Sequence, residues 1–261
     1  MAADRVTDDP ATETPDAPAL TVVVPVYNEA ENLRPLVTDI CAALEGELEY
    51  EIVYVDDGST DDTARTLRAL ATERARLRTV RHRRRAGQSA AIASGVLAAH
   101  APMIATLDGD GQNDPADIVD LLRAFRDTPC EDRVRLLVTG QRTRRRDGWV
   151  KRASSVVANR VRARVLRDEA PDTGCGLKVF TRAAFLELPH FDHMHRFLPA
   201  LVLRGGGRVI SVPVGHRPRS AGRSKYGIAN RLWVGIVDLF GVMWLRRRPI
   251  ASALDDTEKE H

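Results

Sequence analysis

Short apolar runs alternate with helical segments through the first half of the chain, and this alternation most constrains the fold. Leu20–Val26 (LTVVVPV) and Tyr50–Val55 (YEIVYV) are rich in β-branched residues, and a stretch suited to a helix follows each of them. Runs of this kind are typical of buried parallel strands. Strands that alternate with helices at this spacing predict a doubly wound, mostly parallel α/β sheet.

The remaining predicted elements continue this pattern. Further strands are expected at Leu77–Val80, Met103–Leu107, Arg135–Gly140 and Val209–Val214. Helices are expected at Glu29–Leu44, between Thr60 and about Arg74, at Gly87–Ala99, and from Pro115 onward. After residue 141 the pattern is less regular, so the second half is predicted in less detail.

The charge is distributed unevenly along the 261 residues. The whole chain carries +3, but residues 1–18 hold five acids and one arginine, and residues 251–261 hold four acids and one lysine. Residues 19–250 therefore carry +10. We expect the two acidic ends to be disordered tails around one basic folded domain. A basic domain favours a phosphate-bearing partner such as a nucleotide or an anionic membrane.

Composition excludes several classes of protein. The three cysteines are widely spaced, with no CxxC pair or Cys/His cluster, so neither a disulfide framework nor a zinc site is expected. The N-terminus has no apolar signal-peptide core, and a reducing cytoplasm is the expected location. Aromatic residues make up only 5% of the chain, which argues against a nucleic-acid partner.

An apolar segment lies near the C-terminus, at Leu232–Leu245, and ends in Arg246-Arg247-Arg248. It is shorter than the roughly 20 residues that a membrane-spanning helix needs. The sequence leaves two alternatives for residues 228–250. One is an amphipathic helix that rests on an anionic membrane, and the other is a helix that packs on the core.

The strongest chemical signal is Asp108-Gly109-Asp110-Gly111-Gln112, directly after the fourth predicted strand. Two carboxylates one residue apart, with an amide oxygen nearby, suit Mg²⁺ or Mn²⁺ that also contacts phosphate oxygens. Ligands of open α/β sheets bind at the carboxyl ends of the strands, where this motif lies. A metal site of Asp108, Asp110 and Gln112 is therefore predicted.

Two further motifs follow the first two strands and should lie on the same edge of the sheet. They are Pro25-Val26-Tyr27-Asn28-Glu29 and Asp56-Asp57-Gly58-Ser59. The tyrosine could stack on a base, and a carboxylate could accept hydrogen bonds from a base or ribose. No GxGxxG or Walker A loop is present, which argues against dinucleotide oxidoreductases and P-loop enzymes.

These motifs together resemble the family-2 inverting glycosyltransferases. The matching segments are VVVPVYNEAENL, IVYVDDGSTDDT, AGQSAAIASG and LDGDGQNDP, and the resemblance covers roughly residues 20 to 245. Its subgroup includes dolichyl-phosphate mannose synthase and bacterial polyprenyl-phosphate glycosyltransferases. The resemblance implies a GT-A, Rossmann-like domain over residues 19–227. It also implies that a nucleotide-sugar donor binds near Pro25, Tyr27, Glu29, Val55, Asp56, Asp57, Asp108, Gly109 and Asp110.

Later segments also resemble parts of this subgroup, and some of these parts bind the phosphate of a polyprenyl phosphate acceptor. They are Gly140-Gln141-Arg142, a helix that begins near Arg152, Asp172-Thr173-Gly174-Cys175-Gly176-Leu177-Lys178, and the loop Arg219–Tyr226. The family has Phe-Arg where this chain has Leu177-Lys178, which leaves the role of Lys178 open. The expected acceptor-phosphate contacts are Arg142, Arg152, Arg196, Arg219 and Lys225.

The predicted reaction is a single displacement with inversion, in which a lipid phosphate oxygen attacks the sugar of GDP-mannose or UDP-glucose. Asp108, Asp110 and the metal would stabilise the leaving group, and Arg142, Arg219 and Lys225 would hold phosphate. Such an enzyme would lie peripherally on the cytoplasmic face of a membrane.

Two alternatives stay open at this point. The acceptor could instead be a sugar hydroxyl or another small acceptor, which would require a general base such as Asp192 or His195. The chain could also be a non-catalytic basic binding module, whose binding would depend on salt but not on metal.

Overall fold

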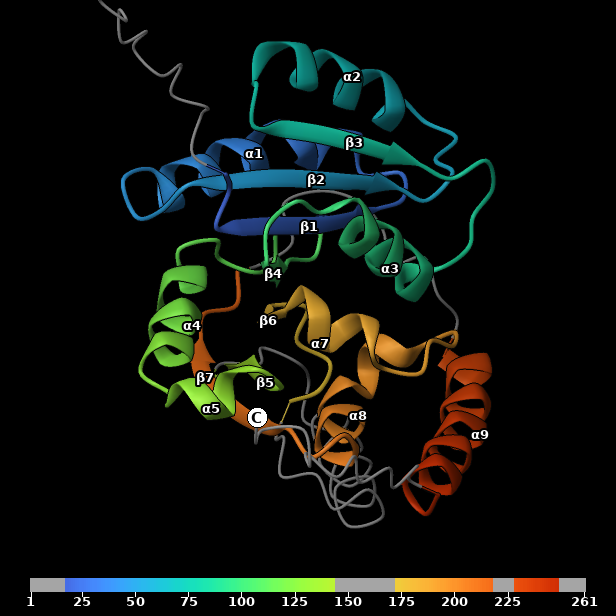
Figure 1. The fold of residues 1–261 in the computed structure, drawn as a ribbon. Helices are drawn as coiled ribbons and strands as arrows, with labels where there is room; N and C mark the ends of the chain where they lie inside the picture. Colours follow the sequence, from blue (N-terminus) through green and yellow to red (C-terminus); the bar gives the residue numbers. More distant parts are fainter. Residues whose placement is uncertain (1–16, 144–171, 218–227, 249–261) are drawn as a thin grey trace, which may run out of the picture.

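The computed structural model describes residues 17–143, 172–217 and 228–248, and places seven strands of this part of the chain in one sheet (Figure 1). The strand order is β3-β2-β1-β4-β6-β5-β7. The strands are β1 Leu20–Val26, β2 Tyr50–Asp56, β3 Leu77–Arg81, β4 Met103–Thr106, β5 Leu136–Arg142, β6 Lys178–Thr181 and β7 Arg208–Val214. The predicted mostly parallel α/β sheet is confirmed, and all six predicted strands are present.

The one strand of the sheet that was not predicted, β6, is antiparallel to both of its neighbours, β4 and β5. Its four residues lie between two strands that run the other way, so its first residue pairs with the last residue of β4 and with the middle residue of β5. Thr106 of β4 and Thr139 of β5 both pair with Lys178. The chain thus runs back through the middle of the sheet, which places residues 172–178 at the edge where ligands bind.

Helices cover both faces of the sheet. The α-helices are α1 Ala30–Leu44, α2 Thr63–Glu73, α3 Gln88–Ala98, α4 Asp117–Arg126, α5 Cys130–Arg133, α7 Arg182–Leu186, α8 Leu198–Arg204 and α9 Ile228–Arg246, and a 3₁₀ turn, η1, spans Met194–Arg196. The helices predicted after β1, β2, β3 and β4 are confirmed as α1 to α4. The short helices α5, α7 and α8 were not predicted.

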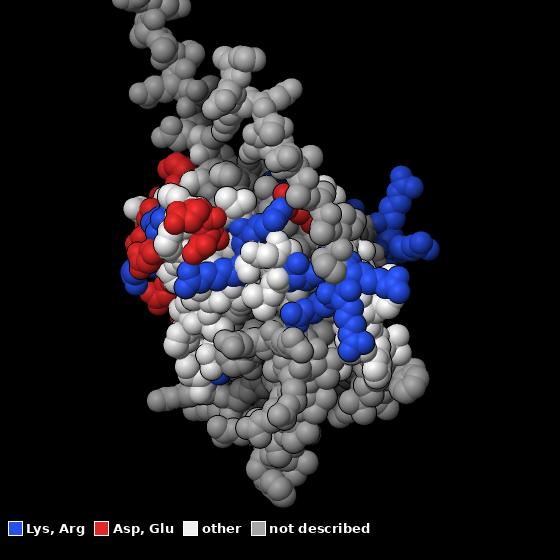
Figure 2. Space-filling model, turned by 60° about the horizontal axis from the view of Figure 1, so that its bottom comes forward, with Lys and Arg blue, Asp and Glu red and all other residues white. Residues whose placement is uncertain are grey.

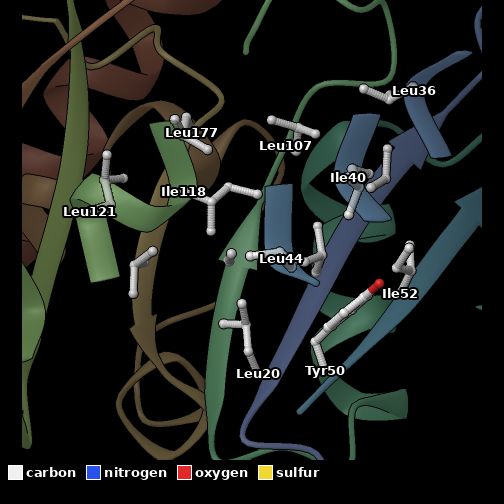
Figure 3. Packing of buried hydrophobic residues seen from close by; sticks show 14 of the residues in the cluster. Leu20, Leu36, Ile40, Leu44, Tyr50, Ile52, Leu107, Ile118, Leu121 and Leu177 are labelled. Carbon is white, nitrogen blue, oxygen red and sulfur yellow. The ribbon is translucent and has the colours of Figure 1, made fainter. Parts of the chain in front are cut away.

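Strand alternation divides the core into two clusters. Val22 and Val24 point to one face, where they pack with α1, α2 and α4 in the cluster of Figure 3. Val23 points to the other face, toward α3, α8 and α9. This period of two explains why a run as apolar as VVVPV is needed: both of its faces are buried.

Helix α3 lies close against the sheet at Gly95. A Cβ placed there would lie 2.4 Å from Cγ1 of Val23 and 3.1 Å from Cγ2 of Val55. Both neighbours belong to central strands, so neither side chain has space to move away. The close contact fixes α3, whose N-terminus borders the site described below.

We expect Gly95→Ala to lower the free energy of unfolding by about 1 to 3 kcal/mol, because the added methyl group overpacks the core. Gly241→Ala is a matched control in α9, where a Cβ would meet nothing within 4 Å. That change should be neutral or stabilising by up to about 1 kcal/mol, because alanine favours the helix. Chemical denaturation of both variants tests this, and equal effects would contradict the packing argument.

Candidate active site

A cavity of about 620 Å³ opens at the carboxyl ends of β1 and β4 and the adjoining ends of β5 and β6. The strand order reverses between β1 and β4, which is the position where open α/β sheets bind ligands. The polar residues that line it include members of every predicted strand-end motif, together with residues around the start of α3 and on η1. They are Tyr27, Glu29, Asp57, Arg85, Gln88, Thr106, Asp108, Asp110, Gln112, Arg142, Thr173, Lys178, His195 and Arg196.

The turn after β1 is locked to the turn after β2. Asn28 adopts a left-handed backbone conformation (φ 53°). Its side-chain Oδ1 accepts a hydrogen bond from the Thr60 backbone N–H at 2.8 Å, and its own N–H donates to Ser59 Oγ at 2.9 Å. Asn is one of the few residues that tolerate this conformation. The lock holds Tyr27 at the cavity wall, where the Arg85 guanidinium lies 4.4 Å from its ring centre.

Asp57 borders the cavity, but its carboxylate is also the anchor of the loop between β3 and α3. It accepts backbone hydrogen bonds from Ala86 at 2.7 Å and Gly87 at 2.8 Å, and pairs with Nδ1 of His82 at 2.8 Å. Since this loop carries Arg85, Asp57 helps to position the residues around the predicted nucleotide.

Two of the predicted donor contacts are not part of the cavity wall. Val55 packs in the core cluster beneath α3. Asp56 is buried, accepts a hydrogen bond from the Ser59 backbone N–H at 2.8 Å, and lies 3.1 Å from Nε of Arg81. Both residues shape the β2 turn from below. Pro25, Tyr27, Glu29, Asp57, Asp108, Gly109 and Asp110, the other predicted donor contacts, all line the cavity.

The two carboxylates of the Asp108–Asp110 motif lie together in the cavity. Gln88 Nε2 donates to Asp108 Oδ1 at 2.8 Å, and the Gln112 backbone N–H donates to Asp110 Oδ1 at 3.2 Å. Burial, together with the nearby negative charge of Asp110, raises the pKa of Asp108 to about 6. The protein thus keeps the Asp108 carboxylate at a position that disfavours its charge.

This arrangement suits a divalent cation. Magnesium is usually held by one or two carboxylates together with substrate phosphates, rather than by a cage made only of protein. Asp108, Asp110 and Gln112 all line the cavity and supply such a partial set of oxygen ligands. The oxygen donors present therefore suit a metal that also binds substrate phosphates. Among the described residues, no group of three or more His, Cys, Asp or Glu side chains that could hold a metal is present.

Residues 172–178 form the wall that faces the two carboxylates. Gly176 lies so close to Asp108 that a Cβ would come within 2.2 Å of its carboxyl carbon. The Gly176 carbonyl accepts a hydrogen bond from Thr106 Oγ1 at 2.6 Å, and the Gly140 backbone N–H donates to the Leu177 carbonyl at 2.9 Å. Only glycine fits at position 176, and the wall is fixed to both β4 and β5.

Two cations are held in this wall. Arg142, at the end of β5, makes a bidentate pair with Asp172 through Nε at 2.7 Å and Nη2 at 2.8 Å. This pairing raises the pKa of Arg142. Lys178 is 4% exposed, donates from Nζ to the Cys175 carbonyl, and has a pKa lowered by burial. Charge from Asp108 opposes that shift.

The opposite wall carries His195 and Arg196 on the 3₁₀ turn. Burial, together with the nearby cations Arg196 and Lys178, lowers the pKa of His195 to about 3. The Asp192 side chain is 66% exposed and does not line the cavity. The predicted phosphate contacts Arg142 and Arg196 therefore share one cavity. Arg152, Arg219 and Lys225 lie outside the described residues.

Several cavity residues escaped prediction. Gln88 and Arg85 lie around the start of α3, where the sequence predicted only a helix of small residues. The role of Lys178 was left open because Leu177-Lys178 replaces the Phe-Arg of the family, and β6 was not expected. A short apolar run after a predicted ligand loop is the signal that could have found it.

Solved structures with the same architecture define the class of fold. Glucosyl-3-phosphoglycerate synthase from Mycobacterium tuberculosis, solved with Mg²⁺ and uridine diphosphate, superposes with a TM-score of 0.62 at 19% identity, covering 88% of this chain and 79% of that one. Mannosyl-3-phosphoglycerate synthase from Rubrobacter xylanophilus gives a TM-score of 0.68 at 16% identity, covering 92% and 78%. The fold is that of the GT-A glycosyltransferases, as predicted.

Sequence comparison specifies the family. The Glycosyl transferase family 2 pattern matches residues 21–188. Dodecaprenyl-phosphate galacturonate synthase of Rhizobium johnstonii is 36% identical over 248 residues, or 93% of this chain and 70% of that protein. Undecaprenyl-phosphate 4-deoxy-4-formamido-L-arabinose transferase of Edwardsiella ictaluri is 34% identical over 211 residues, or 80% of this chain and 63% of that protein. The chain belongs to glycosyl transferase family 2 and is a glycosyltransferase.

Asp108→Asn should raise the free energy of unfolding at pH 8 without metal, by up to about 2 kcal/mol, because the folded carboxylate has a raised pKa. The unfolded carboxyl titrates near pH 4 and the folded one near pH 6. The advantage of the variant should therefore shrink as the pH falls through 6 and vanish below about 4. Denaturation in EDTA at several pH values measures it. Lower stability of the variant at pH 8 would contradict the buried-charge account.

Proposed function

We propose that the enzyme transfers a sugar, with inversion, from a nucleotide-sugar donor to a polyprenyl phosphate. The observation that carries this proposal is the charge pattern of one cavity. Asp108 and Asp110 lie on one side, and Arg142, Lys178 and Arg196 border the same space. Carboxylates that suit a metal–diphosphate and cations that suit a second phosphate are what such a reaction requires.

The acceptor is supported by the two relatives, whose names both specify a polyprenyl phosphate, dodecaprenyl or undecaprenyl. The donor sugar is less constrained. The sequence resemblance favours mannose or glucose, carried by GDP or UDP, whereas the relatives are named for galacturonate and a formamido-arabinose. A pyranose on a nucleoside diphosphate is common to all of these.

In this mechanism a phosphate oxygen of the lipid attacks the anomeric carbon as the bond to the nucleoside diphosphate breaks. Mg²⁺ or Mn²⁺, held by Asp108, Asp110 and Gln112, would supply charge neutralisation to the leaving diphosphate. The lipid phosphate is already ionised at pH 7, so the nucleophile needs no protein base.

The chain's own residues hold the two anions together. Arg142 keeps a fixed orientation because Asp172 pairs with it in bidentate geometry, which leaves its remaining donors for phosphate. Lys178 adds a second positive charge deep in the cavity. These cations offset the repulsion between donor diphosphate and acceptor phosphate, which would otherwise oppose their approach.

The C-terminal helix offers a surface for the lipid membrane. Val237, Phe240 and Trp244 are 54%, 60% and 56% exposed and lie three and four residues apart, on one side of α9. Leu239, Val242 and Met243 pack inward on the core, and α9 lies next to α8 at the border of the molecule (Figure 1). The helix therefore has one face on the core and one face exposed.

Charge favours an anionic membrane as the partner of that exposed face. Arg247 and Arg248 follow it directly and are exposed, and the Arg248 guanidinium lies 5.2 Å from the Trp244 ring centre. Lys and Arg side chains gather on one part of the described surface and Asp and Glu on another (Figure 2). No helix among the described residues is long and apolar enough to cross a bilayer. We propose peripheral contact with the cytoplasmic leaflet.

Phe240→Ser should weaken binding to phosphatidylglycerol vesicles about tenfold, because a buried aromatic contact with the bilayer is lost. Leu97→Ser is the matched control: Leu97 is also 60% exposed, but it lies on α3. Vesicle co-sedimentation compares the two variants. Equal binding by Phe240→Ser and the original protein would remove α9 from the membrane contact.

A donor screen tests the reaction itself. The protein is incubated with Mn²⁺, undecaprenyl phosphate and one of several donors: GDP-mannose, UDP-glucose, UDP-galacturonate or a UDP-aminoarabinose derivative. We expect a glycosylated lipid phosphate from one of them, lost in EDTA and reduced more than about a hundredfold in Asp110→Ala, because the leaving diphosphate loses its metal. Donor hydrolysis without lipid product would keep the donor and refute the acceptor.

A further inference from the structure

His195 has a fixed hydrogen-bond partner on α3, the helix that borders the cavity. Ser89, which is 4% exposed on α3, places its Oγ 2.7 Å from Nδ1 of His195. The same Oγ lies 3.2 Å from the backbone nitrogen of His195. One hydroxyl therefore contacts both the backbone and the ring of a single residue, which fixes the ring's position.

These two contacts determine which ring nitrogen carries the proton. A backbone N–H can only donate, so Ser89 Oγ accepts a hydrogen bond from it and keeps its own proton to donate. Among the described residues, Nδ1 of His195 is the acceptor within reach. If Nδ1 carried the proton instead, the buried hydroxyl proton would be left without a partner, at a cost of about 1 to 3 kcal/mol. Nδ1 therefore accepts, and the neutral ring carries its proton on Nε2.

Nε2 is the nitrogen available to a ligand. His195 borders the cavity, and Nε2 has no hydrogen-bond partner among the described residues. Nε2 is not one of the side-chain atoms of those residues that are both buried and without a hydrogen-bond partner. Since it has no such partner, it is not fully buried and reaches open space. Burial and the cations Arg196 and Lys178 keep the ring neutral, since they lower its pKa to about 3.

The turn that carries His195 is held from the outside as well. His193 adopts a left-handed backbone conformation (φ 62°), and its Nδ1 lies 3.2 Å from Oδ2 of Asp238 on α9. The turn is thus fixed between α3 and α9. A donor held this firmly on both sides is preorganised for one substrate atom.

We propose that His195 contacts the bound substrate as a neutral hydrogen-bond donor, through Nε2–H to a phosphate or hydroxyl oxygen, and not as a general base. The proposal rests on the sugar transfer proposed above only for the identity of the substrate. A neutral donor beside Arg196 and Lys178 adds directionality without further positive charge. It also agrees with a nucleophile that is already ionised, because no residue is then needed to remove a proton.

The tautomer can be tested without any substrate. In ¹⁵N-labelled protein at pH 7, long-range ¹H–¹⁵N NMR distinguishes a protonated ring nitrogen from an unprotonated one. We expect His195 to show a protonated Nε2 and an unprotonated Nδ1, and Ser89→Ala to lose this preference. A protonated Nδ1 or a charged ring in the original protein would overturn the proposal. This outcome does not depend on which reaction is catalysed.

The role in substrate contact is tested with two substitutions, using whichever donor and acceptor the original protein turns over. His195→Gln keeps an N–H donor near the position of Nε2, whereas His195→Leu removes it. We expect His195→Leu to lose about ten- to a hundredfold in kcat/KM and His195→Gln to recover most of that loss. His190→Leu, at an exposed histidine outside the cavity wall, controls for general effects.

The pH profile separates this role from base catalysis. A hydrogen-bond donor predicts the same acid limb of kcat/KM for the original protein and His195→Gln. If His195→Leu and His195→Gln lose the same amount of kcat/KM and the acid limb of the profile disappears, His195 is a general base and the proposal is refuted. Full activity of His195→Leu would also refute it. If the kcat/KM loss appears with donor hydrolysis alone, Nε2 contacts the donor; if it requires lipid phosphate, Nε2 contacts the acceptor.

Discussion

The close contact between Gly176 and the Asp108 carboxyl group is the constraint on which the rest of the site depends. It exists because β6 runs against its neighbours and brings residues 172–178 over the end of β4. The same short segment supplies Asp172, which orients Arg142, and Lys178, which places a positive charge near Asp108. One reversed strand of four residues therefore brings the carboxylates and the cations of the cavity together.

As a consequence, the charges of the site are electrostatically unfavourable until substrate binds. Burial disfavours the charge on Asp108 and on Lys178, and each partly offsets the cost of the other. A bound metal–diphosphate would take over this compensation, because the carboxylates would then coordinate the metal directly. Functional sites often contain buried charged pairs that lower the stability of the folded protein. A neutral His195 is consistent with this, since a protonated ring would add a further positive charge beside Arg142, Lys178 and Arg196.

The sequence predicted the first half of the chain well and the second half less completely. The runs at β1 and β2 are mostly apolar on both faces, so strand structure and burial follow from residue type, and the helix after each run predicts the parallel direction. The Asp108–Asp110 motif followed a buried strand and therefore had to lie at the ligand edge. In contrast, the four residues of β6 have no periodicity of their own, and their pairing depends on contacts far along the chain. Ser89 and His195 are 106 residues apart, so only the fold could bring them together.

The central claim is that Asp108 and Asp110 hold a metal–nucleoside diphosphate in the cavity. Calorimetric titration of UDP and GDP into the protein, with Mn²⁺ or with EDTA, tests it most directly. The account predicts binding of at least one nucleotide that requires Mn²⁺ and weakens at least about tenfold, or about 1.4 kcal/mol, in Asp110→Asn. Asp192→Asn, which alters an exposed carboxylate outside the cavity wall, should bind normally. Nucleotide binding that depends on neither Mn²⁺ nor Asp110 would show that these carboxylates do not hold a metal–nucleoside diphosphate.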